Sequence, residues 1–92
     1  YAATTRKDLD GWPENGWLSN EKMSIDQAIS SITKWSAYSM FAENFYGSIK
    51  KDYLADFTVL NKNLSLIDPA DIPEVRVLYT FVDGKIVYQN DK

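Results

Sequence analysis

The side chains that most often carry out chemistry in proteins are scarce in this sequence of 92 residues. It contains no cysteine and no histidine, so it cannot by itself build a thiol nucleophile, a Ser-His-Asp triad or an ordinary zinc site. The carboxylates that remain for acid–base chemistry are scattered along the chain. We therefore expect no catalytic residue, no metal site and no cofactor within these residues.

Two acidic stretches are the candidates for a carboxylate site. Asp68, Asp71 and Glu74 stand among prolines, but a calcium loop needs closer oxygen spacing and a glycine for its sharp turn. Asp8 and Asp10 form a pair without neighbours that would give its two members different roles in proton transfer. We predict that both stretches are solvated surface.

An aromatic pair in the first 23 residues could contact a ligand. Trp12 and Trp17 flank Pro13 and Gly16 in a segment without hydrophobic periodicity, which indicates a loop. The two rings could form a platform for a carbohydrate or another small molecule, or they could pin a long loop onto a core. We favour the second interpretation, and the sequence leaves the first one open.

Composition excludes several classes of protein. Ten basic and thirteen acidic residues give a formal net charge of −3 without a basic patch, so we expect neither nucleic acid nor membrane as a partner. Hydrophobic residues at 45% and charged residues at 25% are typical of a globular domain and exclude wholesale disorder. No apolar run has the length of a membrane-spanning helix, and we expect a cytoplasmic location.

The elements that must hold these residues begin with a helix. Ser24 and Gln27 fit a capping box, in which each side chain binds the other residue's backbone N–H. The helix is predicted to run from Ser24 to residues 41–43. One stripe of it is apolar and is interpreted as a core face, formed by Ile25, Ala28, Ile29, Ile32, Trp35 and Met40.

Strand patterns follow Gly47, so the fold class is predicted to be α+β. Asp83–Gly84 is a two-residue loop of the kind that favours a type I′ turn. This turn predicts a hairpin in which Phe81 opposes Ile86 and Tyr79 opposes Tyr88. The predicted strands are Ser48–Ile49, Phe57–Leu60, Arg76–Val82 and Lys85–Gln89.

The order of these segments resembles the C-terminal part of amidohydrolase-superfamily enzymes, in the branch called amidohydrolase 3. Residues 24–29 (SIDQAI) resemble the "S-x-x-E-A-L" start of a helix near the end of these enzymes. Residues 47–49 (GSI) and 54–60 (LADFTVL) are similar to "G-S-L-x-x-G-x-x-A-D-L-V-V-L-D". Residues 77–88 (VLYTFVDGKIVY) resemble the terminal "V-x-x-T-x-V-x-G-K-V-V-Y" hairpin. Upstream, residues 5–11 resemble a loop in which "T-R" precedes a glycine-rich turn.

The sequence departs from this pattern at three positions. Asp52 replaces a turn glycine, Tyr53 replaces the lysine after it, and Asn61 replaces an aspartate at the end of a strand. Aspartate is among the residues that best tolerate a left-handed backbone, so we expect Asp52 to keep the turn.

The resemblance implies that this chain is the C-terminal segment of a metal-dependent hydrolase built on a (β/α)8 barrel. Residues 1–46 would form the end of the barrel, a loop plus the last helix. Residues 47–92 would form the C-terminal antiparallel strands of a composite β-sandwich. The histidines, the carboxylated lysine and the aspartate that hold one or two divalent metals of the zinc type would lie before Tyr1. The segment alone would then be inactive.

The implied activity is hydrolysis of non-peptide, amide-type C–N bonds. Loops at the C-terminal ends of barrel strands shape the pocket, so Arg6, Trp12 and Trp17 would lie nearest to substrate. Arg6 is the first candidate for a substrate contact, with a structural ion pair as its alternative role. Implied partners are the missing N-terminal and barrel portion and, for the isolated segment, a second copy. The alternative function is a free-standing protein-interaction or regulatory domain without enzymatic activity.

Overall fold

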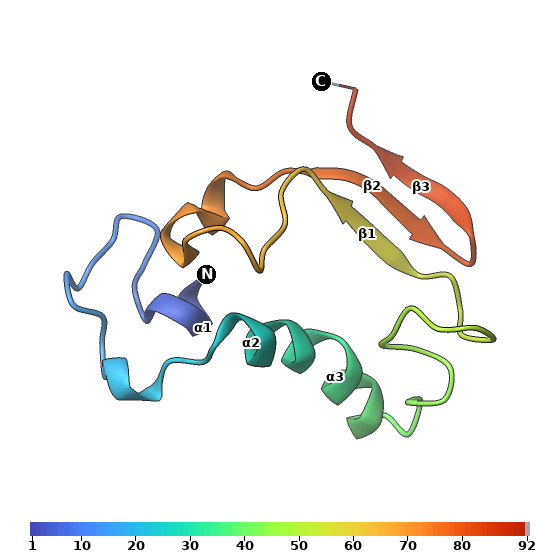
Figure 1. Cartoon of the computed structure of the whole chain (residues 1–92), viewed down its shortest axis with the longest axis horizontal. Coiled ribbons are helices and arrows are strands. Elements are labelled where there is room, and N and C mark those ends of the chain that lie inside the picture. The colour runs from blue at the N-terminus through green and yellow to red at the C-terminus, as the bar shows by residue number, and fades with distance from the viewer. Residues whose placement is uncertain (92) are drawn as a thin grey trace.

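A computed structural model describes residues 1–91. The α-helices lie along one side of the molecule and a three-stranded sheet along the other, which confirms the α+β class (Figure 1). In chain order the elements are α1 (Ala2–Thr5), the 3-10 helix η1 (Ser19–Glu21), α2 (Ile25–Ile32), α3 (Lys34–Ser39), β1 (Phe57–Leu60), the 3-10 helix η2 (Pro69–Glu74), β2 (Val77–Val82) and β3 (Lys85–Gln89). None of the helices within these 91 residues has the length and hydropathy to cross a membrane.

The predicted capping box is confirmed, but the predicted single helix is wrong. Gln27 N donates to Ser24 Oγ at 3.1 Å, and Ser24 N donates to Gln27 Oε1 at 3.0 Å. The helix breaks at Thr33, where φ is −121° and ψ is −97°, and continues as α3. Thr33 Oγ1 donates to the Ile29 carbonyl at 2.7 Å, a back-bond of the kind that bends helices at Ser and Thr.

Gly47 allows the chain to return closely against α3. Its φ is +91°, and a Cβ at this position would lie 2.8 Å from Lys34 Cα and 3.0 Å from Ala37 Cβ. Ala37 is 2% exposed and is the single buried apolar residue among residues 1–91. A side chain at position 47 would therefore collide with the backbone of α3.

The sheet has the order β1-β2-β3, with antiparallel pairs. Asp83 and Gly84 both have positive φ, at 52° and 75°, so the predicted I′-type turn is confirmed. Phe81 pairs with Ile86 as predicted, but Tyr79 pairs with Gln89 and not with Tyr88.

A bulge explains the difference in register. The pairing shifts between Thr80 and Phe81, which leaves Val87 of β3 as the additional residue. β3 is an edge strand that is exposed along its whole length, and edges accommodate such insertions easily. Ser48–Ile49, predicted as a strand, forms no ladder and lies in the loop after α3, because Gly47 has turned the chain there.

The turn at Asp52 keeps the conformation expected of it. Its φ is 71°, in the left-handed region, although glycine occupies this place in the amidohydrolase pattern. Two hydrogen bonds form a brace between the segment before β1 and the tip of the hairpin. Asp83 N donates to Asp56 Oδ1 at 2.7 Å, and Gly84 N donates to the Ala55 carbonyl at 3.0 Å.

The chain buries little of its own surface. Its radius of gyration is 15.1 Å, where a compact domain of this length has about 12 Å. Its accessible surface is 7274 Å², where a folded monomer of 10.5 kDa exposes about 5,400 Å². The interpretation of the helical stripe as a core face holds only in part for this chain alone. Ile25, Ala28 and Ile29 are half-buried, whereas Ile32, Trp35 and Met40 are exposed.

Candidate functional site

The loop after α1 folds back on the end of that helix and brings Arg6 and Trp17 together. Arg6 terminates α1 in a left-handed conformation, with φ 58° and ψ 32°, and its N–H donates to the Ala2 carbonyl. Trp17 N donates to the Arg6 carbonyl at 2.8 Å. Gly16 permits this approach, because a Cβ there would lie 2.6 Å from the Thr5 carbonyl oxygen.

The side chains of this pair are also in contact. Arg6 Nε donates to the Trp17 carbonyl at 3.0 Å, and Arg6 Cζ lies 5.0 Å from the centroid of the Trp17 ring. A guanidinium over an indole face is a favourable cation–π arrangement. Arg6 is half-buried while Trp17 is 62% exposed, so the guanidinium lies at the surface and is held there by the indole ring.

Trp12, the third residue predicted to lie near substrate, stands apart from this pair in its contacts. The residue is 69% exposed, and its backbone N–H donates to Asp8 Oδ1 at 3.0 Å. The same carboxylate oxygen accepts from Asp10 N at 2.9 Å. The Asp8 carboxylate therefore holds the loop by accepting from two backbone N–H groups. This is a structural role for a residue that was a candidate for acid–base chemistry.

The second acidic stretch has a structural use as well. Asp68 Oδ1 accepts from Ala70 N at 2.9 Å at the start of η2. Among residues 1–91 no three side chains of the metal-ligating types lie together, and the sequence has no histidine or cysteine. The residues of this chain therefore do not fit the divalent metal that the amidohydrolase resemblance implies.

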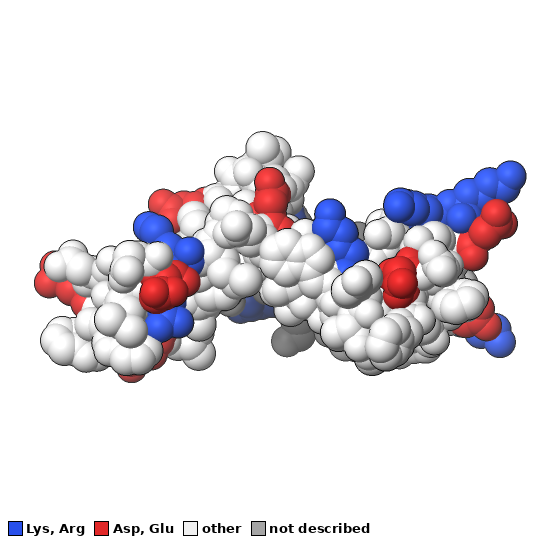
Figure 2. All heavy atoms as spheres, turned by 90° about the horizontal axis from the view of Figure 1, so that it is seen from below, with Lys and Arg blue, Asp and Glu red and all other residues white. Residues whose placement is uncertain are grey.

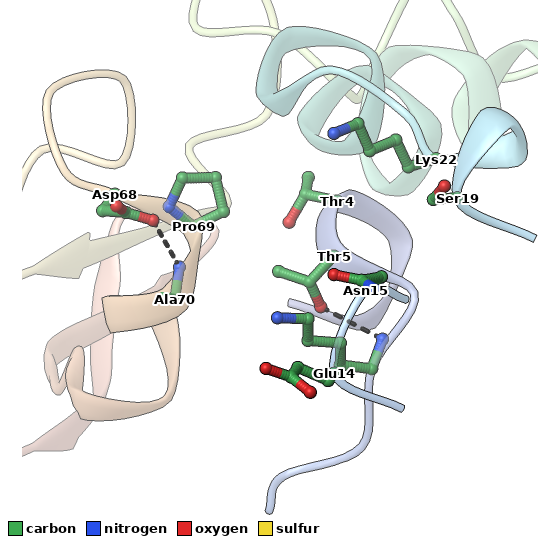
Figure 3. A pocket seen from close by; sticks show the side chains of 10 residues that line it. Thr4, Thr5, Glu14, Asn15, Ser19, Lys22, Asp68, Pro69 and Ala70 are labelled. Carbon is green, nitrogen blue, oxygen red and sulfur yellow. Dashed lines mark hydrogen bonds between the residues drawn. The ribbon is translucent and has the colours of Figure 1, made fainter. Parts of the chain in front are cut away.

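A polar cavity of about 440 Å³ lies between the loop after α1 and the start of η2. The labelled side chains Thr4, Thr5, Glu14 and Lys22 project from one wall toward Pro69 and Ala70 on the other (Figure 3). Sequence reasoning missed this cavity because its walls are far apart along the chain, and no local pattern indicates that they meet.

An apolar groove of about 560 Å³ runs beside α3. Ile32, Ala37 and Met40 line it from the helices, and Tyr46 closes it from the following loop. The face of the molecule below the helices is largely uncharged, with scattered charged groups (Figure 2). Of the apolar helical stripe, Ile32 and Met40 line the groove.

Comparison with known proteins gives one consistent result. A family model described as "Amidohydrolase family" matches residues 1–88. The chain is 36% identical over 78 residues to "Putative amidohydrolase YtcJ" of Bacillus subtilis (strain 168), covering 83% of this chain and 15% of that protein. It is 31% identical over 75 residues to "Protein LONG AFTER FAR-RED 3" of Arabidopsis thaliana, covering 82% of this chain and 13% of that protein.

No solved structure matches the chain. The matched region spans less than a sixth of the length of either curated relative, while it takes in most of this chain. The match includes the loop with Arg6, the capped helix and the terminal hairpin, which are the segments that carried the resemblance. The chain belongs to the amidohydrolase family.

Proposed function

We propose that this chain is the C-terminal structural part of a metal-dependent hydrolase that acts on non-peptide, amide-type C–N bonds, and that it is not catalytic alone. The observation that carries the proposal is the family match over residues 1–88. Its relatives are several times longer than the matched region, which leaves room for a catalytic domain elsewhere.

In this proposal α2 and α3 form the end of a (β/α)8 barrel, and β1, β2 and β3 join strands from the N-terminal part in a β-sandwich. The exposed surface supports this. The chain exposes about 1,900 Å² more than expected for its mass, and obligate interfaces bury about 1,000–2,500 Å² on each partner. Both edges of the sheet, β1 and β3, are open to pairing with further strands.

The metal ligands in this proposal come from residues outside this chain, because its own residues do not fit a divalent ion. The whole protein is proposed to act in the cytoplasm. The alternative is a free-standing interaction or regulatory domain without hydrolase activity, in which the exposed Trp12 and Trp17 would contact the partner.

Two measurements test the proposal. The coding sequence before the Tyr1 codon is expected to encode an H-x-H motif in the same frame, a few hundred residues upstream. The whole protein, loaded with zinc, is expected to hydrolyse members of a panel of N-acyl compounds, whereas the chain alone does not. A start codon immediately before Tyr1 would contradict the proposal and favour the interaction domain.

A further inference from the structure

We infer that the outer edge of the Arg6 guanidinium is a binding site for a carboxylate group. The contact of Arg6 with Trp17 holds the guanidinium in place, and none of the residues 1–91 accepts a hydrogen bond from that edge. The inference goes beyond the proposed hydrolase function, because it requires neither a metal nor a hydrolysis step.

The first observation is which donors of Arg6 are in use. A guanidinium has five N–H donors, and Nε of Arg6 is occupied by the Trp17 carbonyl at 3.0 Å. Within residues 1–91 the two Nη atoms of Arg6 donate no hydrogen bond. The other arginine differs, because Arg76 Nη1 donates to the carbonyls of Pro73 and Val75 at 3.2 and 3.4 Å.

The second observation is that the side chain of Arg6 is already ordered. Its backbone is held in the left-handed region at φ 58° by hydrogen bonds to Ala2 and Trp17, and its guanidinium lies over an indole ring. Since the rotamer is fixed before a ligand arrives, less side-chain entropy is lost on binding.

The shape and charge of the site select the ligand. Two parallel Nη–H groups match the two oxygens of a planar carboxylate. The surrounding loop carries Arg6 and Lys7 but also Asp8, Asp10 and Glu14, so it is slightly negative overall. Such a loop disfavours a phosphate dianion more than a single carboxylate.

The carboxylate has two possible sources, a small molecule or an Asp or Glu side chain from elsewhere in the protein. Both are tested in the protein at its full natural length, by thermal unfolding in increasing sodium acetate at constant ionic strength. Acetamide serves as the neutral isostere. Arg6→Gln is compared with Lys7→Gln, which makes the same change of charge at the next residue.

If the ligand is a small molecule, acetate raises the midpoint of unfolding of the wild type and of Lys7→Gln, but not of Arg6→Gln, and acetamide has no effect. If the ligand is a protein side chain, acetate changes neither variant, and Arg6→Gln lowers the midpoint more than Lys7→Gln does by an amount that is larger near pH 7 than near pH 3, where carboxyl groups are protonated. Each result supports the inference and identifies the source. Loss of the contacts with Trp17 alone would give the same difference at both pH values, and that result overturns the inference. If Arg6→Gln behaves like Lys7→Gln in both respects, the inference is overturned.

Two further variants guard against a loss of folding in Arg6→Gln. Arg6→Lys keeps the charge but loses the planar fork, so it should weaken acetate binding or lower the midpoint as Arg6→Gln does. Trp17→Leu removes the supporting ring, and as a positioning residue it should weaken acetate binding roughly threefold while Arg6 remains. Wild-type behaviour of Arg6→Lys in both readouts would also overturn the inference.

Discussion

The isolated chain is expected to form a dimer through the apolar surface that it leaves uncovered. Burial of about 400 Å² of apolar surface per chain, or about 800 Å² in a dimer, gives roughly 20 kcal/mol at about 25 cal/mol per Å². Loss of translational and rotational freedom and ordering of side chains cost about 12 kcal/mol. The difference of about 8 kcal/mol corresponds to a Kd of about 1 μM.

The apolar groove beside α3 is the surface to perturb. Met40 lines it and is 66% exposed, so Met40→Glu adds a charge there without disturbing a buried contact. A charge that must be desolvated in an interface should raise the Kd by a factor of ten or more. Asn20→Glu is the control, because it adds the same charge at an exposed position of η1 outside the groove.

Sedimentation equilibrium near neutral pH is the assay, at a chain concentration of about 50 μM, well above the expected Kd. Wild type and Asn20→Glu should sediment as dimers, and Met40→Glu should shift toward the monomer. A single monomeric species for the wild type would refute the reasoning, since it would mean that the apolar surface of the chain stays exposed to water without driving association. Equal dimerisation of both variants would place the contact away from the groove.

Three other outcomes are expected. Gly47→Ala should lower the free energy of unfolding by about 2–3 kcal/mol, because φ is positive and the new Cβ would collide with Lys34. The control Gly11→Ala also has a positive φ but open space around it, and it should lower the free energy of unfolding by only about 1 kcal/mol. Equal losses for the two variants in urea unfolding would contradict the collision. Gly84→Val should cost more than about 1 kcal/mol through φ alone, and an unchanged urea midpoint would count against the turn. Calorimetric titration of the chain with zinc should show no stoichiometric binding of sub-micromolar affinity, because imidazole and thiolate ligands are missing from the sequence.

The features that could be predicted from the sequence are those set by neighbouring residues. The capping box at Ser24 needs only Gln27, and the turn at Asp83 needs only two residues that accept positive φ. The break at Thr33 comes with a back-bond to Ile29, which a helical threonine can make but need not make. The bulge at Val87 depends on the pairing with β2. Hydrophobic periodicity contains no information about either. The apolar stripe indicates which face of the helix is to be buried, but it does not identify the surface that buries it.

The candidate site divides in the same way. Arg6, Trp12 and Trp17 could be selected by residue type and by resemblance. The contact between Arg6 and Trp17 depends on Gly16, whose missing side chain lets the loop approach the Thr5 carbonyl. No spacing rule predicts such a contact, because it requires the path of the loop in three dimensions.

The brace at the hairpin tip has a consequence for local opening of the fold. Amide protons at a two-residue turn usually exchange rapidly with solvent, because they have no partner outside the hairpin. Here the amides of Asp83 and Gly84 donate to Asp56 and Ala55, residues that precede β1. Deuterium can enter these two positions only when the segment before β1 detaches from the tip. Hydrogen exchange at the two turn amides should therefore report how often the segment before β1 detaches from the hairpin tip. It should be slower than the exchange of the amides along the exposed outer strand β3.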